Sequence, residues 1–316
     1  MKARRWNQFA FVLSAVCSAA CSSENEGLSP QAPRDGGGAD TGDIEPPCGP
    51  STLAAGTFSL SFGGADYGYI VHLPPDYDGT KRAPLVLNWH GYTSNAQQQQ
   101  LFSNFDLVAD AEGFIVVYPN SPDASWNGGT CCGGGAAGRD DVGFARALVA
   151  ELSSKACIDA KRIYSMGMSN GGFMSFRLGC EAADLFAAIA PVAGKIGIAD
   201  CRPTRPIALL AIHGTADSLV AYNTGALSPE MLTVPDTAQK WADLDACQGP
   251  NSISDGSNWS CRAWSSCSES VGVTLCTIDG GGHCWPGQSY CPFPTVTTNF
   301  DANREIATFF KSFKLP

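Results

Sequence analysis

The sequence predicts an α/β fold: a mostly parallel central sheet with helices on both faces, braced by disulfides. Short apolar runs alternate with amphipathic segments along most of the chain, as in proteins whose β-strands alternate with helices. Of the 316 residues, 44% are hydrophobic and 16% are charged, which is typical of a globular protein. Fourteen cysteines accompany an N-terminal segment that has the features of an export signal, and this combination favours disulfides.

The N-terminal residues are expected to lie outside the folded domain. Residues 1–20 begin with the basic sequence MKARR, continue with an apolar run too short to span a bilayer, and end in small residues, which together indicate a signal peptide. Residues 21–47 are rich in Gly, Pro and acidic residues, as in a flexible tether. We expect residues 48–316 to form a single folded domain, with a length typical of a catalytic domain. We expect a monomer outside the cytoplasm, either secreted or lipid-anchored to a bacterial cell surface.

Cys21 directly follows the expected cleavage site and resembles the lipidated cysteine of bacterial lipoproteins. Ser18 stands where lipoproteins usually have Leu, so cleavage with and without lipidation both stay open. A lipid on Cys21 is the only membrane attachment that we expect. Cys17 leaves with the signal peptide, and the cysteines that follow Cys21 are even in number, which indicates a disulfide framework whose pairing the sequence does not determine.

The elements of the domain follow from hydrophobic periodicity. Alternating segments at 57–62 and 67–73 predict an antiparallel hairpin. Apolar runs predict strands at 85–89, 114–118, 162–168, 207–212 and 273–278. Helices are expected through Leu101, Phe105 and Val108, along the apolar face of residues 144–152, after Ser169, and at 306–313. The pair Asp140-Asp141 is expected to cap the helix that follows it. The segment 248–270, rich in Ser, Cys and Trp, is expected to be a disulfide-pinned excursion outside the sheet.

One short segment, GMSNGGF at 167–173, places a serine between an apolar strand and a helix. Gly167, Ser169 and Gly171 match the G-x-S-x-G nucleophile elbow. A tight turn requires glycine whatever its chemistry, so the motif alone is equally consistent with a structural turn. If Ser169 is a nucleophile, it requires a base that accepts its proton and an acid that orients the base.

Both partners follow in the chain order Ser, Asp, His that is usual for this elbow. Asp217 lies in HGTAD, directly after a predicted strand, and His283 lies in the glycine-rich loop DGGGHCWPG after another. Asp279 is an alternative acid because of its closeness to His283 in sequence, but chain order favours Asp217. His213 and His72 are expected to have structural roles.

A nucleophile of this kind also needs an oxyanion hole, which is a pair of N–H donors aimed at the developing negative charge. Asn170, the residue after the nucleophile, is the first candidate donor. The second comes from the sequence HGYT at 90–93, at the end of the first parallel strand, where either Tyr92 or Thr93 can donate.

Taken together, the segments HGY, DDVGF, RIYSMGMSNGGFMS, FAAIAPVAG, HGTAD and GGGHCWPG are similar to the polyhydroxybutyrate depolymerase and feruloyl esterase family of α/β-hydrolases, which is related to carbohydrate esterase family 1. The similarity extends from about Gly56 to Phe313. It implies an α/β-hydrolase fold, a triad of Ser169, Asp217 and His283, and an oxyanion role for the turn at His90. The chain departs from the family at Cys284, where relatives often have Thr. The adjacent Cys131 and Cys132 resemble a family loop, and the alternative is two disulfides to separate partners.

The expected function is that of an exported serine carboxylic-ester hydrolase that releases feruloyl or cinnamoyl groups from plant polysaccharide fragments. Trp285 and His90 are the candidate substrate-binding residues. Trp285, together with Tyr92, can offer an aromatic face to the acyl ring, or it can pack beneath its loop. Hydrolysis of short polyhydroxybutyrate oligomers, acyl transfer to an alcohol, and a non-catalytic polysaccharide-binding module are the alternatives.

Partners and cofactors are limited by charge and cysteine chemistry. The net charge of −10 disfavours nucleic acid, since the phosphate backbone is also negative. No metal and no cofactor are expected, because exported cysteines are usually oxidised and so cannot bind zinc. The expected partner is a small-molecule or oligosaccharide ester.

Overall fold

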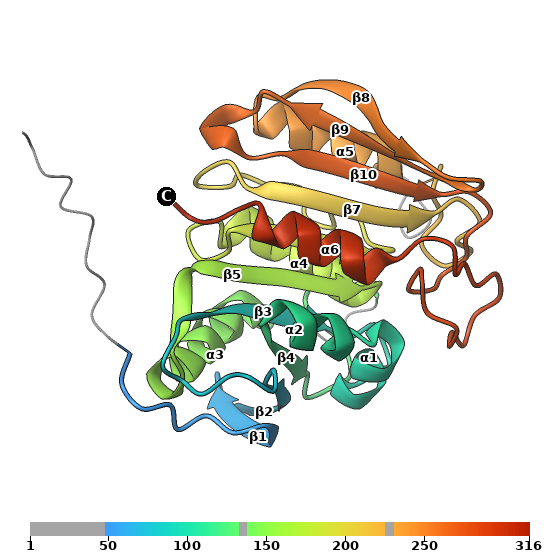
Figure 1. Cartoon of the computed structure of the whole chain (residues 1–316). Coiled ribbons are helices and arrows are strands. Elements are labelled where there is room, and N and C mark those ends of the chain that lie inside the picture. The colour runs from blue at the N-terminus through green and yellow to red at the C-terminus, as the bar shows by residue number, and fades with distance from the viewer. Residues whose placement is uncertain (1–47, 133–137, 225–230) are drawn as a thin grey trace, which may run out of the picture. The chain divides into compact units, whose positions relative to one another are not determined.

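The computed structural model describes residues 48–132, 138–224 and 231–316. The expected signal peptide at 1–20 and tether at 21–47, with Cys21, lie outside the described residues. The described part forms a ten-stranded sheet in the order β1-β2-β4-β3-β5-β6-β7-β10-β9-β8 (Figure 1). Its strands are β1 (Gly56–Phe62), β2 (Ala65–His72), β3 (Ala83–Trp89), β4 (Ile115–Asn120), β5 (Ile158–Met168), β6 (Ala188–Val192), β7 (Ala208–Gly214), β8 (Gln248–Asp255), β9 (Trp259–Ser265) and β10 (Val273–Ile278).

The centre of the sheet is parallel and both edges are antiparallel. Neighbouring strands from β4 to β10 in the sheet order run parallel, whereas β1 and β2 at one edge and β9 and β8 at the other are antiparallel. Every residue of β3 and β7 is buried, as expected for parallel strands that are covered on both sides. The predicted α/β-hydrolase class, with a mostly parallel sheet, is confirmed.

Helices cover the two faces of the sheet and enclose two hydrophobic cores (Figure 1). The helices are α1 (Ala96–Ser103), α2 (Asp106–Glu112), α3 (Asp141–Lys155), α4 (Asn170–Glu181), α5 (Val234–Leu244) and α6 (Ala302–Lys311). Leu87 of β3 belongs to the core under α3, α4 and α5, while its neighbour Val86 belongs to the core under α1, α2 and α6. This alternation is what the period of two along a strand produces.

Two expectations about elements need correction, and two further elements had no prediction. The segment 248–270 was expected to lie outside the sheet, but β8 and β9 extend the sheet there. Since β8 is almost entirely exposed, it has no alternating apolar pattern from which to predict it.

The single helix expected through Leu101 and Val108 is two helices, because Asn104 adopts the left-handed conformation at φ 45° and ends α1. Strand β6 and helix α5 were not predicted.

Asp140 caps α3 as expected, since its side chain accepts a hydrogen bond from the Gly143 N–H at 2.7 Å. Asp141 has a different role from the one expected. It is fully buried and accepts hydrogen bonds from Arg139, from the Tyr67 hydroxyl and from the Asn127 N–H. It therefore serves as the centre of a polar network that connects β2 to the start of α3.

The cysteines of the described residues form six disulfides, as the even number of cysteines predicted. The pairs are Cys48–Cys157, Cys131–Cys132, Cys180–Cys201, Cys247–Cys267, Cys261–Cys276 and Cys284–Cys291. The alternative in which Cys131 and Cys132 bond to separate partners is wrong, because they bond to each other. A disulfide-rich chain of this kind is typical of an oxidising, extracytoplasmic compartment. None of the helices described is both long and apolar enough to cross a membrane.

Candidate active site

Ser169 lies at the sharp turn between β5 and α4, with φ 56° and ψ −119°. The glycines around it allow a close approach of neighbouring backbone. A Cβ on Gly167 would lie 2.6 Å from the carbonyl oxygen of Trp89, and one on Gly171 would collide with the same oxygen. The strand β3 therefore passes directly against the turn, and only glycine fits at these two positions.

The side chains of Asp217 and His283 meet although they come from different loops. His283 follows β10, Asp217 follows β7, and Nδ1 of His283 lies 2.7 Å from Oδ2 of Asp217. Oδ1 of Asp217 accepts hydrogen bonds from the backbone N–H groups of Leu219 and Val220, at 2.9 and 2.8 Å. These bonds fix the carboxylate, which in turn orients the imidazole with Nδ1 as the donor and leaves Nε2 for the pocket.

The alternative acid Asp279 does not take part in this contact. Its Oδ1 accepts a hydrogen bond from the Thr215 hydroxyl at 3.1 Å in an exposed position. His213 lies beside Asp217, where its Nε2 is 2.7 Å from the carbonyl oxygen of Val220 and 3.4 Å from the carboxylate. His72 pairs with Asp110 on α2, away from the elbow.

The carboxyl group of Asp217 is held in its ionised form. Burial raises the pKa of Asp217, but the close contacts of its carboxylate with His213 and His283 outweigh burial, so the pKa lies well below its ordinary value. A carboxylate that stays charged can stabilise a neighbouring imidazolium when one forms.

The turn at Gly91 lies beside Ser169, because a Cβ on Gly91 would be 3.5 Å from the Cβ of Ser169. Thr93 has its N–H group bonded to the carbonyl oxygen of Ala124 at 2.8 Å. Of the two donors that the sequence left open, the structure therefore favours the N–H group of Tyr92. On the other side, Asn170 is the first residue of α4, where backbone N–H groups have no partner within the helix.

His90 supports this turn and has no surface in the pocket, so the prediction that it binds substrate is corrected. It is fully buried, and its Nδ1 lies 2.7 Å from the carbonyl oxygen of Gly91 while its Nε2 accepts a hydrogen bond from the Ser121 N–H. Burial lowers the pKa of His90 to about 4. The neutral ring is thus the form that holds the turn, with a proton on Nδ1.

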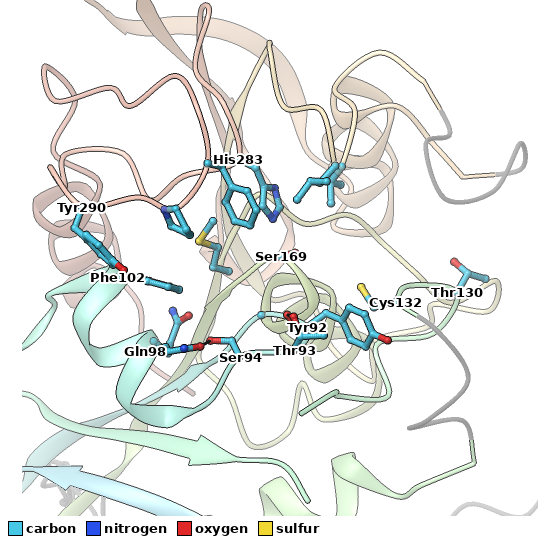
Figure 2. A pocket seen from close by; sticks show the side chains of 17 residues that line it. Tyr92, Thr93, Ser94, Gln98, Phe102, Thr130, Cys132, Ser169, His283 and Tyr290 are labelled. Atoms are coloured by element: carbon cyan, nitrogen blue, oxygen red, sulfur yellow. Dashed lines mark hydrogen bonds between the residues drawn. The ribbon is translucent and has the colours of Figure 1, made fainter. Parts of the chain in front are cut away.

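A pocket of about 740 Å³ opens above Ser169 and is lined by His283 (Figure 2). Aromatic side chains that the sequence analysis missed form part of its wall. Phe102 of α1 and Tyr290 have ring centroids 5.5 Å apart, and Phe293 packs edge-on against His283 at 5.2 Å. Tyr290 and Phe293 lie in the segment CWPGQSYCPFP that directly follows His283. The presence of these aromatic residues close to His283 in sequence was the signal from which an aromatic pocket wall could have been predicted.

Trp285 does not line this pocket, and the prediction that it offers an aromatic face is corrected. Only 1% of its surface is exposed, and its indole N–H donates a hydrogen bond to Oδ1 of Asn303 at 2.7 Å. It packs beneath its own loop in the core that also contains Phe300 and Ile306. The alternative, in which Trp285 packs beneath its loop, is the one that the structure shows.

No group of three or more His, Cys, Asp or Glu residues in the described part of the chain is arranged to hold a metal ion. Cys284, which follows His283 directly, is bonded to Cys291 and is not a free thiolate.

A mostly parallel sheet with Ser169 on a strand-to-helix elbow, and with His283 of the buried Asp217–His283 pair lining the same pocket, is the arrangement typical of α/β-hydrolases. The model of the family described as "Esterase PHB depolymerase" matches residues 67–203. This chain belongs to the polyhydroxybutyrate depolymerase and feruloyl esterase family and is a carboxylic ester hydrolase.

Two relatives and one solved structure illustrate the similarity. The chain is 38% identical over 231 residues to Feruloyl esterase B of Piromyces equi, an alignment that covers 68% of this chain and 42% of that protein. It is 30% identical over 241 residues to "Probable feruloyl esterase C" of Aspergillus clavatus, covering 72% and 80%. The acetyl xylan esterase from Aspergillus awamori superposes with a TM-score of 0.58 at 16% identity, over 81% of this chain and 98% of that one, and so shares the fold. The chain thus spans less than half the length of Feruloyl esterase B.

Proposed function

We propose that this chain is an exported feruloyl esterase in which Ser169, His283 and Asp217 form the catalytic triad. The observation that carries the proposal is the pocket above Ser169, whose wall combines His283 with the aromatic side chains of Phe102, Tyr290 and Phe293. A flat cinnamoyl ring packs well against such side chains. The similarity to two proteins named as feruloyl esterases supports the same acyl group.

In the first step of the proposed reaction, the hydroxyl oxygen of Ser169 attacks the ester carbonyl carbon while Nε2 of His283 accepts its proton. The His283 imidazolium is stabilised by Asp217, whose carboxylate lies 2.7 Å from Nδ1. The imidazolium then donates its proton to the leaving alcohol, and the acyl group stays on Ser169. In the second step, water attacks the acyl-enzyme with His283 as base, and the acid is released.

The negative charge that develops on the carbonyl oxygen is bound by two backbone N–H groups in this proposal. One belongs to Asn170 at the N-terminus of α4, where the helix dipole adds to the attraction. The other belongs to Tyr92, since the N–H of Thr93 already donates to Ala124. Preorganised donors of this kind contribute on the order of 3 kcal/mol each to the lowering of the barrier.

The two sides of the pocket differ, and this difference orients the substrate. Figure 2 shows Phe102, Tyr290 and Gln98 on one side of Ser169, and Tyr92, Cys132 and Thr130 on the other. We assign the acyl ring to the side of Phe102 and Tyr290. The saccharide then lies toward Tyr92 and Thr130, and the half-exposed ring of Tyr92 offers a surface on which a sugar can stack.

The test compares initial rates of the wild-type protein on methyl ferulate, methyl acetate and a soluble 3-hydroxybutyrate oligomer. We expect methyl ferulate to have the highest kcat/KM. Tyr290→Ala should lower kcat/KM for methyl ferulate by about 5- to 10-fold, since the aromatic contact contributes about 1 to 1.4 kcal/mol, and should leave the acetate rate within about 2-fold. Leu101→Ala is the matched control, because Leu101 is exposed on the same helix as Phe102 and does not line the pocket. A preference for the oligomer would contradict the feruloyl assignment and favour a polyester substrate.

We further propose that residues 1–20 direct export and that residues 21–47 tether the catalytic domain, residues 48–316, with or without a lipid on Cys21. The disulfides of the domain support an oxidising compartment. Expression in a bacterial host followed by mass analysis of the mature N-terminus tests this. A lipid mass on Cys21 would show anchoring, and a chain that retains residues 1–20 would contradict export.

A further inference from the structure

The disulfide between Cys131 and Cys132 lies between two parts of the proposed catalytic machinery. On one side, Cys131 contacts Asn170, whose side-chain Nδ2 lies 3.7 Å from the Cys131 sulfur. On the other side, Cys131 belongs to a small buried apolar cluster that includes Val220, and Cys132 packs against this cluster; the N–H group of Val220 is bonded to the carboxylate of Asp217. Cys132 itself lines the pocket with Ser169.

The side chain of Asn170 is held on this loop by three contacts. Its Oδ1 accepts the Trp126 N–H at 2.6 Å, and its Nδ2 donates to the Trp126 carbonyl oxygen at 3.0 Å as well as contacting Cys131. Asn170 is fully buried, so these contacts hold its side chain in place at the start of α4. The N–H group that is proposed to bind the oxyanion belongs to this same residue.

The loop is itself fixed against the body of the domain. The Thr130 N–H donates to the Gly197 carbonyl oxygen at 2.7 Å, and Cys131 belongs to the same buried apolar cluster as Phe173 of α4. A bond between adjacent cysteines closes a small ring and restricts the rotation of both side chains, whereas two thiols would rotate independently. The covalent bond thus keeps the Cys131 sulfur on Asn170 and the Cys132 sulfur in the pocket.

We propose that the Cys131–Cys132 disulfide is a positioning element of the oxyanion hole, which acts by fixing Asn170 relative to Ser169. This inference rests on the proposed function, in which Ser169 is the nucleophile and the N–H of Asn170 binds the oxyanion. Because the oxyanion forms in the transition state, loss of the disulfide should lower kcat much more than it raises KM.

Two double variants test the proposal, Cys131→Ala with Cys132→Ala and Cys131→Ser with Cys132→Ser. The second keeps an acceptor near Nδ2 of Asn170 but lacks the ring. We expect both to lower kcat on methyl ferulate by about 10-fold or more, with KM within about 2-fold, since small misplacement of an oxyanion donor is costly. The matched control removes the Cys247–Cys267 disulfide by Cys247→Ala with Cys267→Ala. Those cysteines do not line the pocket, and kcat should stay within about 2-fold.

Thermal unfolding shows that each variant is folded at the assay temperature. Wild-type kcat in either Cys131/Cys132 variant would overturn the proposal. A raised KM with unchanged kcat would also overturn it, because that result would mean that the disulfide only forms part of the pocket wall that binds substrate. Alkylation of the unreduced protein provides a direct check on the bond, since labelled Cys131 or Cys132 would also overturn it.

The rate at which an organophosphonate labels Ser169 separates this proposal from the proposed function, since the adduct places an oxygen in the same hole. If the triad assignment fails, the wild-type protein and all variants stay unlabelled alike. If only the present inference fails, the wild-type protein and both Cys131/Cys132 variants are labelled at the same rate.

Discussion

Nδ1 of His283 lies 2.7 Å from Oδ2 of Asp217, although the two residues are 66 positions apart in the sequence. They meet because β7 and β10 are adjacent and parallel, which brings the loops at their carboxyl ends to the same edge of the sheet. Ser169 reaches that edge from β5, and His283 and Ser169 line one pocket.

Replacement of the serine is the most direct test of the nucleophile. Ser169→Ala should lower kcat on methyl ferulate by at least about 10³-fold, because in the proposed reaction the Ser169 hydroxyl forms the acyl-enzyme. Its thermal unfolding should match that of the wild-type protein, since Ser169 makes no side-chain cap for α4. Ser94→Ala, which removes another hydroxyl that lines the pocket, is the control and should retain activity within about 3-fold. A Ser169→Ala protein with near wild-type rate would disprove the elbow as the catalytic site.

The two candidate acids predict different outcomes. Asp217→Asn should lower kcat by about 10⁴-fold, because an amide no longer holds the His283 imidazole in the required tautomer. Asp279→Asn should leave kcat within about 2-fold, since Asp279 bonds to Thr215 and not to His283. Steady-state measurement of kcat for the two purified variants distinguishes the two acids. An equal loss of kcat in both variants would show that Asp279 also takes part in catalysis.

The close approach of β3 to the elbow predicts a stability effect. Gly171→Ala should destabilise the fold by about 1 to 3 kcal/mol or more, because the added Cβ collides with the Trp89 carbonyl oxygen. Gly49→Ala is the control, as a Cβ at Gly49 meets no atom within 4 Å. Chemical denaturation measures both free energies of unfolding. Equal stability of the two variants would show that the turn relaxes without strain.

Asp245 predicts a dependence of stability on pH. It is buried at the end of α5, and burial raises its pKa to about 7 from an ordinary value of 3.8. Between pH 3.8 and pH 7 the folded state binds more protons than the unfolded state. The contribution of Asp245 to the stability of the fold is therefore fully present below pH 3.8 and is lost as the pH rises through 7. Asp245→Asn should therefore raise stability at pH 8 by on the order of 2 to 4 kcal/mol and have little effect below about pH 4.

Denaturant unfolding at a series of pH values checks this expectation. Asp243→Asn on the same helix is the matched control, because Asp243 is exposed and its replacement removes the same charge. An unchanged pH dependence in Asp245→Asn, or the same change in both variants, would contradict the assignment to Asp245.

The sequence carried more information about the triad partners than about the walls of the pocket. Chain order and strand-end placement led to Asp217 and His283, since both are local features that the topology preserves. The pairing of Phe102 with Tyr290 depends on how two distant loops pack, and no local pattern contains it. Trp285 was misassigned because an aromatic residue in a glycine-rich loop can face either way, and the bond to Asn303 decides which. The exposed strand β8 escaped prediction for a related reason, because it lacks a buried face.

The Cys48–Cys157 disulfide has a mechanical consequence. It joins the first described residue of the domain to the residue directly before β5, across 109 positions of sequence. A pulling force applied at the N-terminal end of the domain therefore enters at Cys48 and passes straight to β5, the strand that directly precedes Ser169, while β1 to β4 carry none of the load along the chain. Strands β1 and β2, which lie between Cys48 and Cys157 in the sequence, are shielded from it.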